Sequence, residues 1–465
     1  MILMQGATRR PRAIAAVCVA ALALSGCSTI GKLNPFAPKD KADSVAEGTR
    51  ISIVAADQTL EPAEALKGAD FFLPAPTTVA EWPLPGGTPE QSVEHVDAAP
   101  NLSIAWRRGF GEGSDRGKHV TAPPVAAAGK VFVMDGEARV SAHDAQSGAE
   151  VWSVNLRPND NKRDKEAFGG GVAYADGKLY VSSGYQFVAQ LDAGTGALGW
   201  RTRTEQPIHA APTVSAGRVM VVAIDNTLAT YDAATGEAGW TYQALSEPAR
   251  ILAASSPAVS GDTVIASFSS GELVALRAAN GNDLWNEALS RASRTSALSE
   301  IRDIPGRPVI YQGDVFAVSH SGVFAATDLR TGQARWSLPM VGVTTPWPAG
   351  DVVFAVSKTG QVVCVARESG QVYWIQDLNA GRKTRKQGGF LGVGSVVTRP
   401  VWSSPILANN RLILADSTGQ LVSLNAKTGA VERKVNLGAS TLIGPIAMGG
   451  TIYVVTDKAQ LIALR

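Results

Sequence analysis

The sequence predicts an all-β chain whose residues 101–465 fold as an eight-bladed β-propeller, a closed ring of four-stranded antiparallel blades. Three observations lead to this fold class. Short runs of Val, Ile and Leu alternate with turns, and the 465 residues include 47 Gly and 25 Pro. The motif Asp-x-x-x-Gly-x-x-x-Trp repeats along the chain. The last repeat lacks one strand, and a matching strand precedes the first repeat.

The repeated motif marks the outer part of each blade. Its Asp accepts hydrogen bonds in a turn, and its Gly supplies the positive φ of that turn. Its Trp places a large apolar ring at a fixed point, which we expect to lie between neighbouring blades. The complete copies are Asp144/Gly148/Trp152, Asp192/Gly196/Trp200, Asp232/Gly236/Trp240 and Asp328/Gly332/Trp336. The copies with substitutions are Arg277/Gly281/Trp285, Ala366/Gly370/Trp374 and Asn425/Gly429/Arg433. A Pro precedes most units, at Pro212, Pro257, Pro308, Pro346 and Pro405.

The chain ends within its eighth unit. Residues 445–465 begin a unit and stop where the Asp turn is expected. The missing outer strand with its Trp is present at residues 102–106, so we expect the N-terminal strand to complete the C-terminal blade and close the ring. Closure removes the exposed strand edges of an open array. About 46 residues per blade is an ordinary blade length.

Residues 1–26 have the features of a lipoprotein signal peptide. Arginines at positions 9, 10 and 12 form a basic head, and an apolar stretch follows over residues 13–24. This stretch is too short to span a bilayer as a stable helix. It ends in Leu-Ser-Gly-Cys, the order of a bacterial lipobox, so the sequence predicts that Cys27 is acylated and becomes the first residue of the mature chain. The residue after the acylated Cys is Ser28 and not Asp, which by the lipoprotein sorting rule of enteric bacteria favours the outer membrane. We therefore expect the chain at the periplasmic face of that membrane.

Residues 27–100 read as a lipidated tether. The stretch is rich in Pro, Ala and charged residues and has little apolar periodicity. Trp82 is the exception, since a large apolar ring is expected to dock on the propeller instead of remaining in solvent.

The composition and motifs argue against several function classes. The whole chain carries 43 Lys and Arg against 41 Asp and Glu, so without the three N-terminal arginines its net charge is close to zero. A near-neutral chain argues against nucleic acid as a partner. The five histidines are far apart in sequence and form no local metal-ligand pair. No phosphate loop or nucleophile elbow is found within the repeats. The three glycines at 169–171 are most simply explained as a turn at the start of a blade. We therefore expect no catalytic residue, metal or cofactor.

A basic cluster lies in the longest gap between repeats, at Arg382, Lys383, Arg385 and Lys386. Such a cluster is typical of a solvated loop. Contact with anionic lipid head groups or with an acidic partner is the alternative.

The repeat resembles that of the pyrroloquinoline-quinone-type propellers, in which two branches compete. Quinoprotein dehydrogenases often use an adjacent-Cys disulfide and a calcium site of Glu, Asn and Asp. Cys364 is the one cysteine left after signal removal and acylation, so that disulfide cannot form here. The second branch is the BamB family of lipoproteins in the outer-membrane β-barrel assembly machinery. From the lipobox at residues 24–27 through the repeats to Arg465, the chain is more similar to BamB.

The BamB resemblance implies two partner-binding loops, which contact the periplasmic domains of the barrel-forming subunit BamA. One loop corresponds to residues 249–257, where Arg250, Ile251 and Leu252 would provide an apolar anchor beside a cation. The other corresponds to residues 299–305, where Glu300, Arg302 and Asp303 would provide a charged surround. Both loops depart from the family pattern, because Arg250 precedes its apolar pair and Pro305 replaces a second acid.

The sequence thus favours a non-enzymatic scaffold that binds a BamA-like barrel protein and assists the insertion of outer-membrane proteins. Unfolded outer-membrane proteins are further candidate partners, and the lipid anchor would hold the chain at the membrane. Two other functions stay open: a quinone-dependent dehydrogenase, and a lipoprotein that binds cell-wall glycan or peptide.

Overall fold

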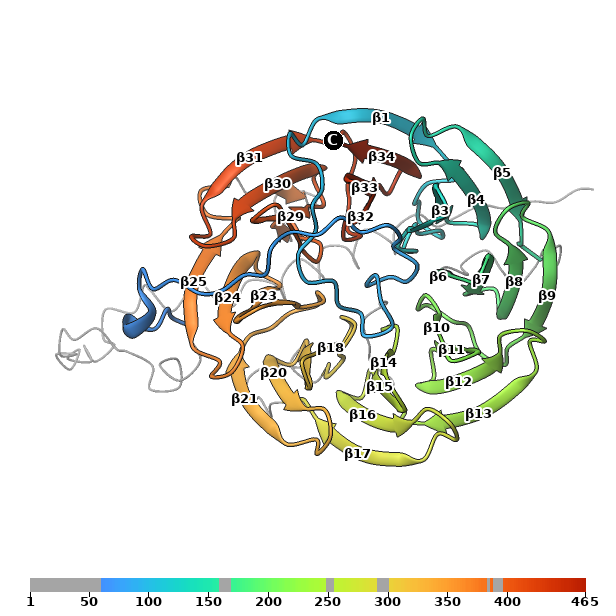
Figure 1. Ribbon diagram of the computed structural model, residues 1–465, viewed down its shortest axis with the longest axis horizontal. Helices are drawn as coiled ribbons and strands as arrows, with labels where there is room; N and C mark the ends of the chain where they lie inside the picture. The colour runs from blue at the N-terminus through green and yellow to red at the C-terminus, as the bar shows by residue number, and fades with distance from the viewer. Residues whose placement is uncertain (1–59, 159–168, 248–254, 291–300, 383–384, 388–395) are drawn as a thin grey trace, which may run out of the picture. The chain divides into compact units, whose positions relative to one another are not determined.

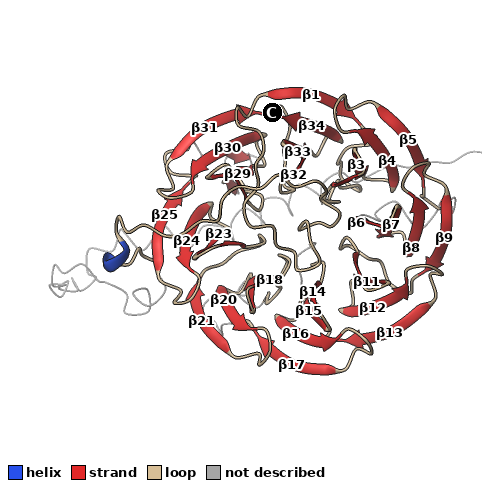
Figure 2. Cartoon of the chain, viewed as in Figure 1, coloured by secondary structure: helices blue, strands red, loops and turns tan. Residues whose placement is uncertain are grey.

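The computed structural model describes residues 60–158, 169–247, 255–290, 301–382, 385–387 and 396–465. Seen in Figure 1, the strands of residues 104–465 surround a common axis as a ring of sheets. Figure 2 shows that strands account for almost all of the regular structure, and the helix within the described residues is the 3₁₀ turn η2 (Glu64–Leu66). The predicted all-β, eight-bladed propeller is confirmed.

Seven blades are four-stranded antiparallel meanders formed by consecutive strands. The first blade contains β2 (Val125–Ala127), β3 (Lys130–Met134), β4 (Arg139–Asp144) and β5 (Glu150–Asn155), and the second contains β6 (Gly170–Ala175), β7 (Lys178–Ser183), β8 (Phe187–Asp192) and β9 (Leu198–Arg203). The third contains β10 (Thr213–Ser215), β11 (Arg218–Val222), β12 (Thr227–Asp232) and β13 (Ala238–Gln243). The fourth contains β14 (Ala258–Ser260), β15 (Thr263–Ser267), β16 (Glu272–Arg277) and β17 (Asp283–Ala288). The next three are β18 (Val309–Tyr311), β19 (Asp314–Val318), β20 (Val323–Asp328), β21 (Ala334–Pro339); β22 (Trp347–Ala349), β23 (Val352–Val356), β24 (Gln361–Ala366), β25 (Val372–Asp377); and β28 (Ile406–Ala408), β29 (Arg411–Ala415), β30 (Gln420–Asn425), β31 (Val431–Asn436). A separate hairpin pairs β26 (Arg385–Gln387) with β27 (Val396–Thr398).

The eighth blade closes the ring as the sequence predicts. Its inner strands are β32 (Ile446–Met448), β33 (Thr451–Val455) and β34 (Gln460–Leu464). Its outer strand is β1 (Ile104–Gly109), which pairs antiparallel with β34 although it lies at the other end of the propeller sequence. Figure 1 shows the first and last colours of the ring side by side in this blade.

The Gly and Trp positions of the repeated motif join neighbouring blades at seven of the eight joints. In the β10–β13 blade, the Asp232 carboxylate accepts the backbone N–H groups of Ala234 and Thr235 at 2.9 and 2.8 Å. Gly236 has φ +76° and lies against the ring of Trp200 from the preceding blade. The Trp200 indole N–H donates to the Ala233 carbonyl at 3.1 Å. The other turn glycines likewise lie against the Trp of the preceding blade, as predicted: Gly148, Gly196, Gly281, Gly332, Gly370 and Gly429.

Residues 60–100, here called the cross-ring segment, pass over one end of the ring axis, as Figure 1 shows. The sequence predicts a tether over residues 27–100, and the structure describes its second half. There the backbone of Trp82 pairs with Ala126, and that of Val96 pairs with Ala408 on a distant blade. Trp82 is buried and its ring stacks on Trp347 at a centroid distance of 6.2 Å, so the expected docking of Trp82 is confirmed.

His95 fixes the cross-ring segment through a neutral imidazole. Its Nε2 accepts the backbone N–H of Asn410 at 2.8 Å, and its Nδ1 lies 2.6 Å from the Pro74 carbonyl oxygen, to which it must donate. Burial lowers the pKa of His95 below its ordinary value of 6.5, against the raising effects of the Pro74 carbonyl and Asp97. The contact requires an unprotonated Nε2, so it belongs to the neutral form.

This geometry predicts an acid-sensitive contribution to stability. Because the folded pKa is depressed, the contribution of neutral His95 is complete above the ordinary pKa and decreases as pH falls below it. We expect the free energy of unfolding of the wild type to exceed that of His95→Gln by an amount that shrinks between about pH 7.5 and 5.5. Denaturant unfolding of both proteins across this range measures it, and a constant difference would contradict the assignment.

Candidate functional site

The two ends of the ring differ in what they present. Because strands within a blade are antiparallel, the links from each outer strand to the next inner strand gather at one end, which we call the connection face. Two turns of each blade, the one between its first and second strands and the one between its third and fourth strands, lie at the opposite end, called the turn face. The cross-ring segment covers the turn face, where the Val259 N–H donates to the Pro89 carbonyl at 2.7 Å.

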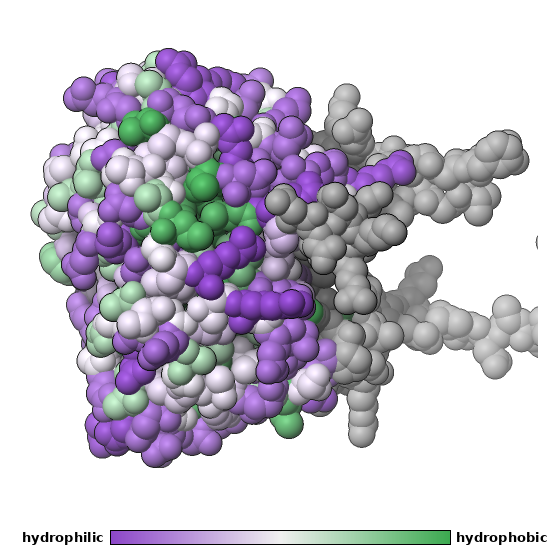
Figure 3. Space-filling view, turned by 90° about the vertical axis from the view of Figure 1, so that its right-hand side faces the viewer, coloured by the Kyte–Doolittle hydropathy of each residue, from purple (hydrophilic) through white to green (hydrophobic). Residues whose placement is uncertain are grey.

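The connection face carries exposed apolar side chains. Leu245 follows β13 and is 67% exposed, and Leu442, between β31 and β32, is 49% exposed. Val341 and Val401, in two further links, are also exposed. The outer strands that form the rim also expose apolar side chains, at Val151, Leu198, Leu284 and Val431. The part of the rim seen in Figure 3 shows hydrophobic areas within a mostly hydrophilic surface. Single exposed apolar residues are ordinary on a protein surface, so these side chains do not by themselves mark a contact site.

The structure describes two of the predicted partner-binding residues. Arg302 is exposed on the link before β18, and its backbone lies close to the β15–β16 turn, where a Cβ on Gly271 would come within 2.9 Å of the Arg302 carbonyl oxygen. Asp303 is 3% exposed, and its carbonyl accepts the His320 backbone N–H at 2.8 Å. Its buried side chain therefore belongs to the base of the link and not to its outer surface. Cys27, Arg250, Ile251, Leu252 and Glu300 lie outside the described residues.

Two basic groups lie beside this link. The Nζ of exposed Lys358 is 2.7 Å from Nε2 of His320, so the ammonium donates to an unprotonated imidazole nitrogen. Burial, followed by the Lys358 charge, lowers the pKa of His320. At neutral pH the surface around Arg302 thus carries the positive charge of Lys358 beside a neutral histidine.

The predicted basic cluster begins with a residue in a buried ion pair. Arg382 donates to the carboxylate of Asp416 at 2.6 Å, and the Asp416 side chain has no exposed area. The Arg382 guanidinium also lies 5.1 Å from the centroid of the Trp402 ring. Arg382 is therefore engaged within the chain. The backbone of Arg385 and Lys386 lies in β26, and Lys383 is outside the described residues.

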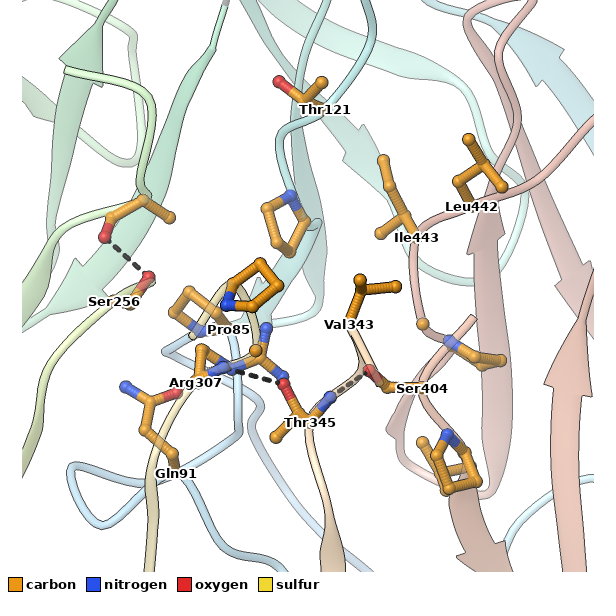
Figure 4. A pocket seen from close by; sticks show the side chains of 18 of the residues that line it. Pro85, Gln91, Thr121, Ser256, Arg307, Val343, Thr345, Ser404, Leu442 and Ile443 are labelled. Atoms are coloured by element: carbon orange, nitrogen blue, oxygen red, sulfur yellow. Dashed lines mark hydrogen bonds between the residues drawn. The ribbon is translucent and has the colours of Figure 1, made fainter. Parts of the chain in front are cut away.

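A cavity of about 170 Å³ lies on the ring axis. Seven blades contribute to it through residues just before their inner strands, among them Thr121, His209, Ser256, Arg307, Thr345, Ser404 and Leu442, and the eighth contributes Gly170, the first residue of β6. Pro85 and Gln91 of the cross-ring segment line the opposite side, as Figure 4 shows. The sequence pattern does not predict this cavity, although the Pro that precedes most inner strands lies next to positions that line it.

The described residues provide no cluster of three or more His, Cys, Asp or Glu side chains able to hold a metal ion. Cys364 is buried within β24, and burial raises the pKa of its thiol well above the ordinary value. No described helix has the length and apolarity to cross a bilayer.

Comparison with known proteins identifies relatives over most of the chain. The family model described as outer membrane protein assembly factor BamB matches residues 90–164, 136–376 and 383–465. The protein of that name from Salmonella typhimurium is 26% identical over 72% of this chain and 83% of its own length. The one from Escherichia coli K12 is 25% identical over 76% of this chain and 86% of its own length.

Solved structures share the fold. BamB from Moraxella catarrhalis superimposes with a TM-score of 0.65 and 18% identity, covering 78% of this chain and 99% of that one. The quinohemoprotein alcohol dehydrogenase from Comamonas testosteroni superimposes with a TM-score of 0.64 and 14% identity, covering 88% and 83%. At these identities both likenesses concern the fold alone, since one fold hosts unrelated functions.

Proposed function

The chain belongs to the outer membrane protein assembly factor BamB family, and on this premise we propose that it is a non-enzymatic scaffold lipoprotein of the outer-membrane β-barrel assembly complex. It binds the periplasmic domains of a BamA-like barrel-forming subunit and assists the insertion of outer-membrane proteins. The observation that carries the proposal is the extent of the family match, which covers residues 90–376 and 383–465 and so includes almost all of the propeller.

The proposed attachment follows from the N-terminal sequence. Residues 1–26 are removed as a signal peptide, Cys27 is acylated, and the propeller of residues 101–465 is held at the periplasmic face of the outer membrane. More than one acyl chain would make this attachment firm, since each buried methylene contributes about 0.8 kcal/mol.

The proposed partner surface is the connection face. Arg302 is exposed there and precedes β18, in the same stretch of sequence as Glu300. Arg250, Ile251 and Leu252 belong to the sequence that joins β13 to β14. Exposed Leu245 lies at the start of the link that carries the apolar pair. An apolar anchor within a charged surround is the usual composition of an energetically important contact. Asp303, being buried, would act by holding the backbone of its link.

Reversal of the Arg302 charge tests the surface. We expect Arg302→Glu to reduce recovery of a BamA-like barrel protein at least about tenfold when the tagged full chain is purified from detergent-solubilised outer membranes. Arg330→Glu is the matched control, because Arg330 is exposed on a third-to-fourth strand turn of the turn face. It should recover the partner as the wild type does.

The possible outcomes distinguish an error in the proposed surface from an error in the proposed function. Equal loss in both variants would show that net charge and not the connection face governs binding. Failure of the wild type to recover any barrel protein would remove the scaffold proposal itself.

A further inference from the structure

Arg307 places a cationic side chain at the axial cavity, and among the described residues its Nε has no hydrogen-bond acceptor. It lies immediately before Pro308 and β18, among the residues that line the cavity. Its Nε is buried and has no hydrogen-bond acceptor, and no ion pair joins its guanidinium to any residue of the described ranges. Burial lowers the pKa of Arg307 to about 10, so the side chain remains charged at neutral pH.

Two hydroxyl groups beside Arg307 have their protons free for a ligand. Thr345 Oγ1 accepts the backbone N–H of Arg307 at 3.1 Å. Ser404 Oγ accepts the backbone N–H of Thr345 at 2.9 Å. Figure 4 shows this chain of contacts from Arg307 through Thr345 to Ser404. A hydroxyl whose oxygen already accepts one hydrogen bond can still donate its own proton, and neither hydroxyl donates to another described residue.

The lining has no acidic group to neutralise Arg307. The described residues around the cavity include neither Asp nor Glu. Arg307 is half-buried, and a partly desolvated charge that lacks a counter-charge is unfavourable, because its desolvation is not offset by an attraction. A charged ligand of opposite sign would remove this cost, and a guanidinium fork suits the oxygens of a carboxylate or phosphate.

We propose that the axial cavity is a binding site for a small oxyanion, a carboxylate or a phosphate, held by Arg307, Thr345 and Ser404. The volume of about 170 Å³ accommodates a ligand the size of acetate or inorganic phosphate together with water. Trp82, Pro85 and Gln91 limit the cavity on the side of the cross-ring segment. A small free anion therefore fits the site better than a group carried on a polymer. The buried Gln91 Oε1, which also lacks a partner, provides one acceptor for a water or a ligand hydroxyl.

Calorimetric titration of the purified full chain with inorganic phosphate, and separately with acetate, tests the proposal at constant ionic strength in chloride. We expect saturable binding of at least one of the two anions to the wild type, and affinity reduced roughly tenfold or more in Arg307→Gln. Arg330→Gln removes the same charge from the turn face and should bind as the wild type does. Anion should also raise the unfolding temperature of the wild type and leave that of Arg307→Gln unchanged.

Two results would overturn the site: no saturable binding of either anion to the wild type, or unchanged affinity in folded Arg307→Gln. If Arg307→Gln does not fold, Thr345→Val decides the question in the folded variant, since it keeps the side-chain shape and removes the hydroxyl that would donate to the anion and that accepts the Arg307 backbone N–H. We expect it to bind the anion several-fold more weakly, and unchanged affinity in Thr345→Val would equally overturn the site.

Discussion

Trp82→Ala is expected to lower the free energy of unfolding by about 3–5 kcal/mol, the usual cost of truncating a fully buried aromatic side chain. Trp82 is 1% exposed and stacks on Trp347 of the β22–β25 blade. Its backbone N–H and carbonyl form hydrogen bonds with Ala126 of β2 at 2.6 and 2.8 Å. One residue thus holds the cross-ring segment to two blades that are far apart in sequence, and its loss leaves a cavity near the ring axis.

Phe72→Ala is the matched control for this substitution. Phe72 lies in the same segment and is 63% exposed. Exposed substitutions usually change stability by no more than about 0.5 kcal/mol. Denaturant unfolding followed by fluorescence and limited proteolysis within residues 60–100 should therefore separate the two variants, with faster cleavage in Trp82→Ala. Equal stability of the two proteins would mean that the cross-ring segment is held by its backbone contacts alone.

The blades were predictable because the information that forms them is local. A turn Asp, a Gly with positive φ and a Trp at fixed spacing specify the outer hairpin of each blade, and Pro257 or Pro405 marks where an inner strand starts. The closing strand was also predictable, because the incomplete last repeat lacks an outer strand with a Trp, and the strand that contains Trp106 supplies both. Each inference used the position of a residue within one repeat, which sequence periodicity reports directly.

The site depends on contacts between distant residues, which periodicity does not report. Val96 pairs with Ala408, and Glu94 accepts a hydrogen bond from the Tyr311 hydroxyl, yet nothing near these residues in sequence signals the contact. The axial cavity likewise arises only when all eight blades converge. Asp303 illustrates the same limit, since its charge suggested a surface group whereas the fold buries its side chain.

Gly236→Ala is expected to destabilise the chain by roughly 2–5 kcal/mol, because two costs add at this position. The first is the left-handed conformation, φ +76°, which costs a residue with a Cβ about 1–2 kcal/mol. The second is a collision, since the new Cβ would lie 2.5 Å from the Trp200 ring of the preceding blade and 3.0 Å from the Thr202 hydroxyl. Overpacking of this kind costs about 1–3 kcal/mol.

Gly217→Ala isolates the conformational cost within the same blade. Gly217 has φ +73°, but a Cβ there would meet no atom within 4 Å. Thermal or denaturant unfolding should therefore show a loss of about 1–2 kcal/mol for Gly217→Ala and a clearly larger loss for Gly236→Ala. Because the extra loss comes from contact between two blades, replacing Trp200 with Leu should recover part of it in the double variant, whereas Gly217→Ala should combine additively with the same replacement. If the two glycine variants were equally stable, the Gly of the repeated motif would serve only its own turn, and the joint between blades would rest on the Trp200 hydrogen bond to Ala233.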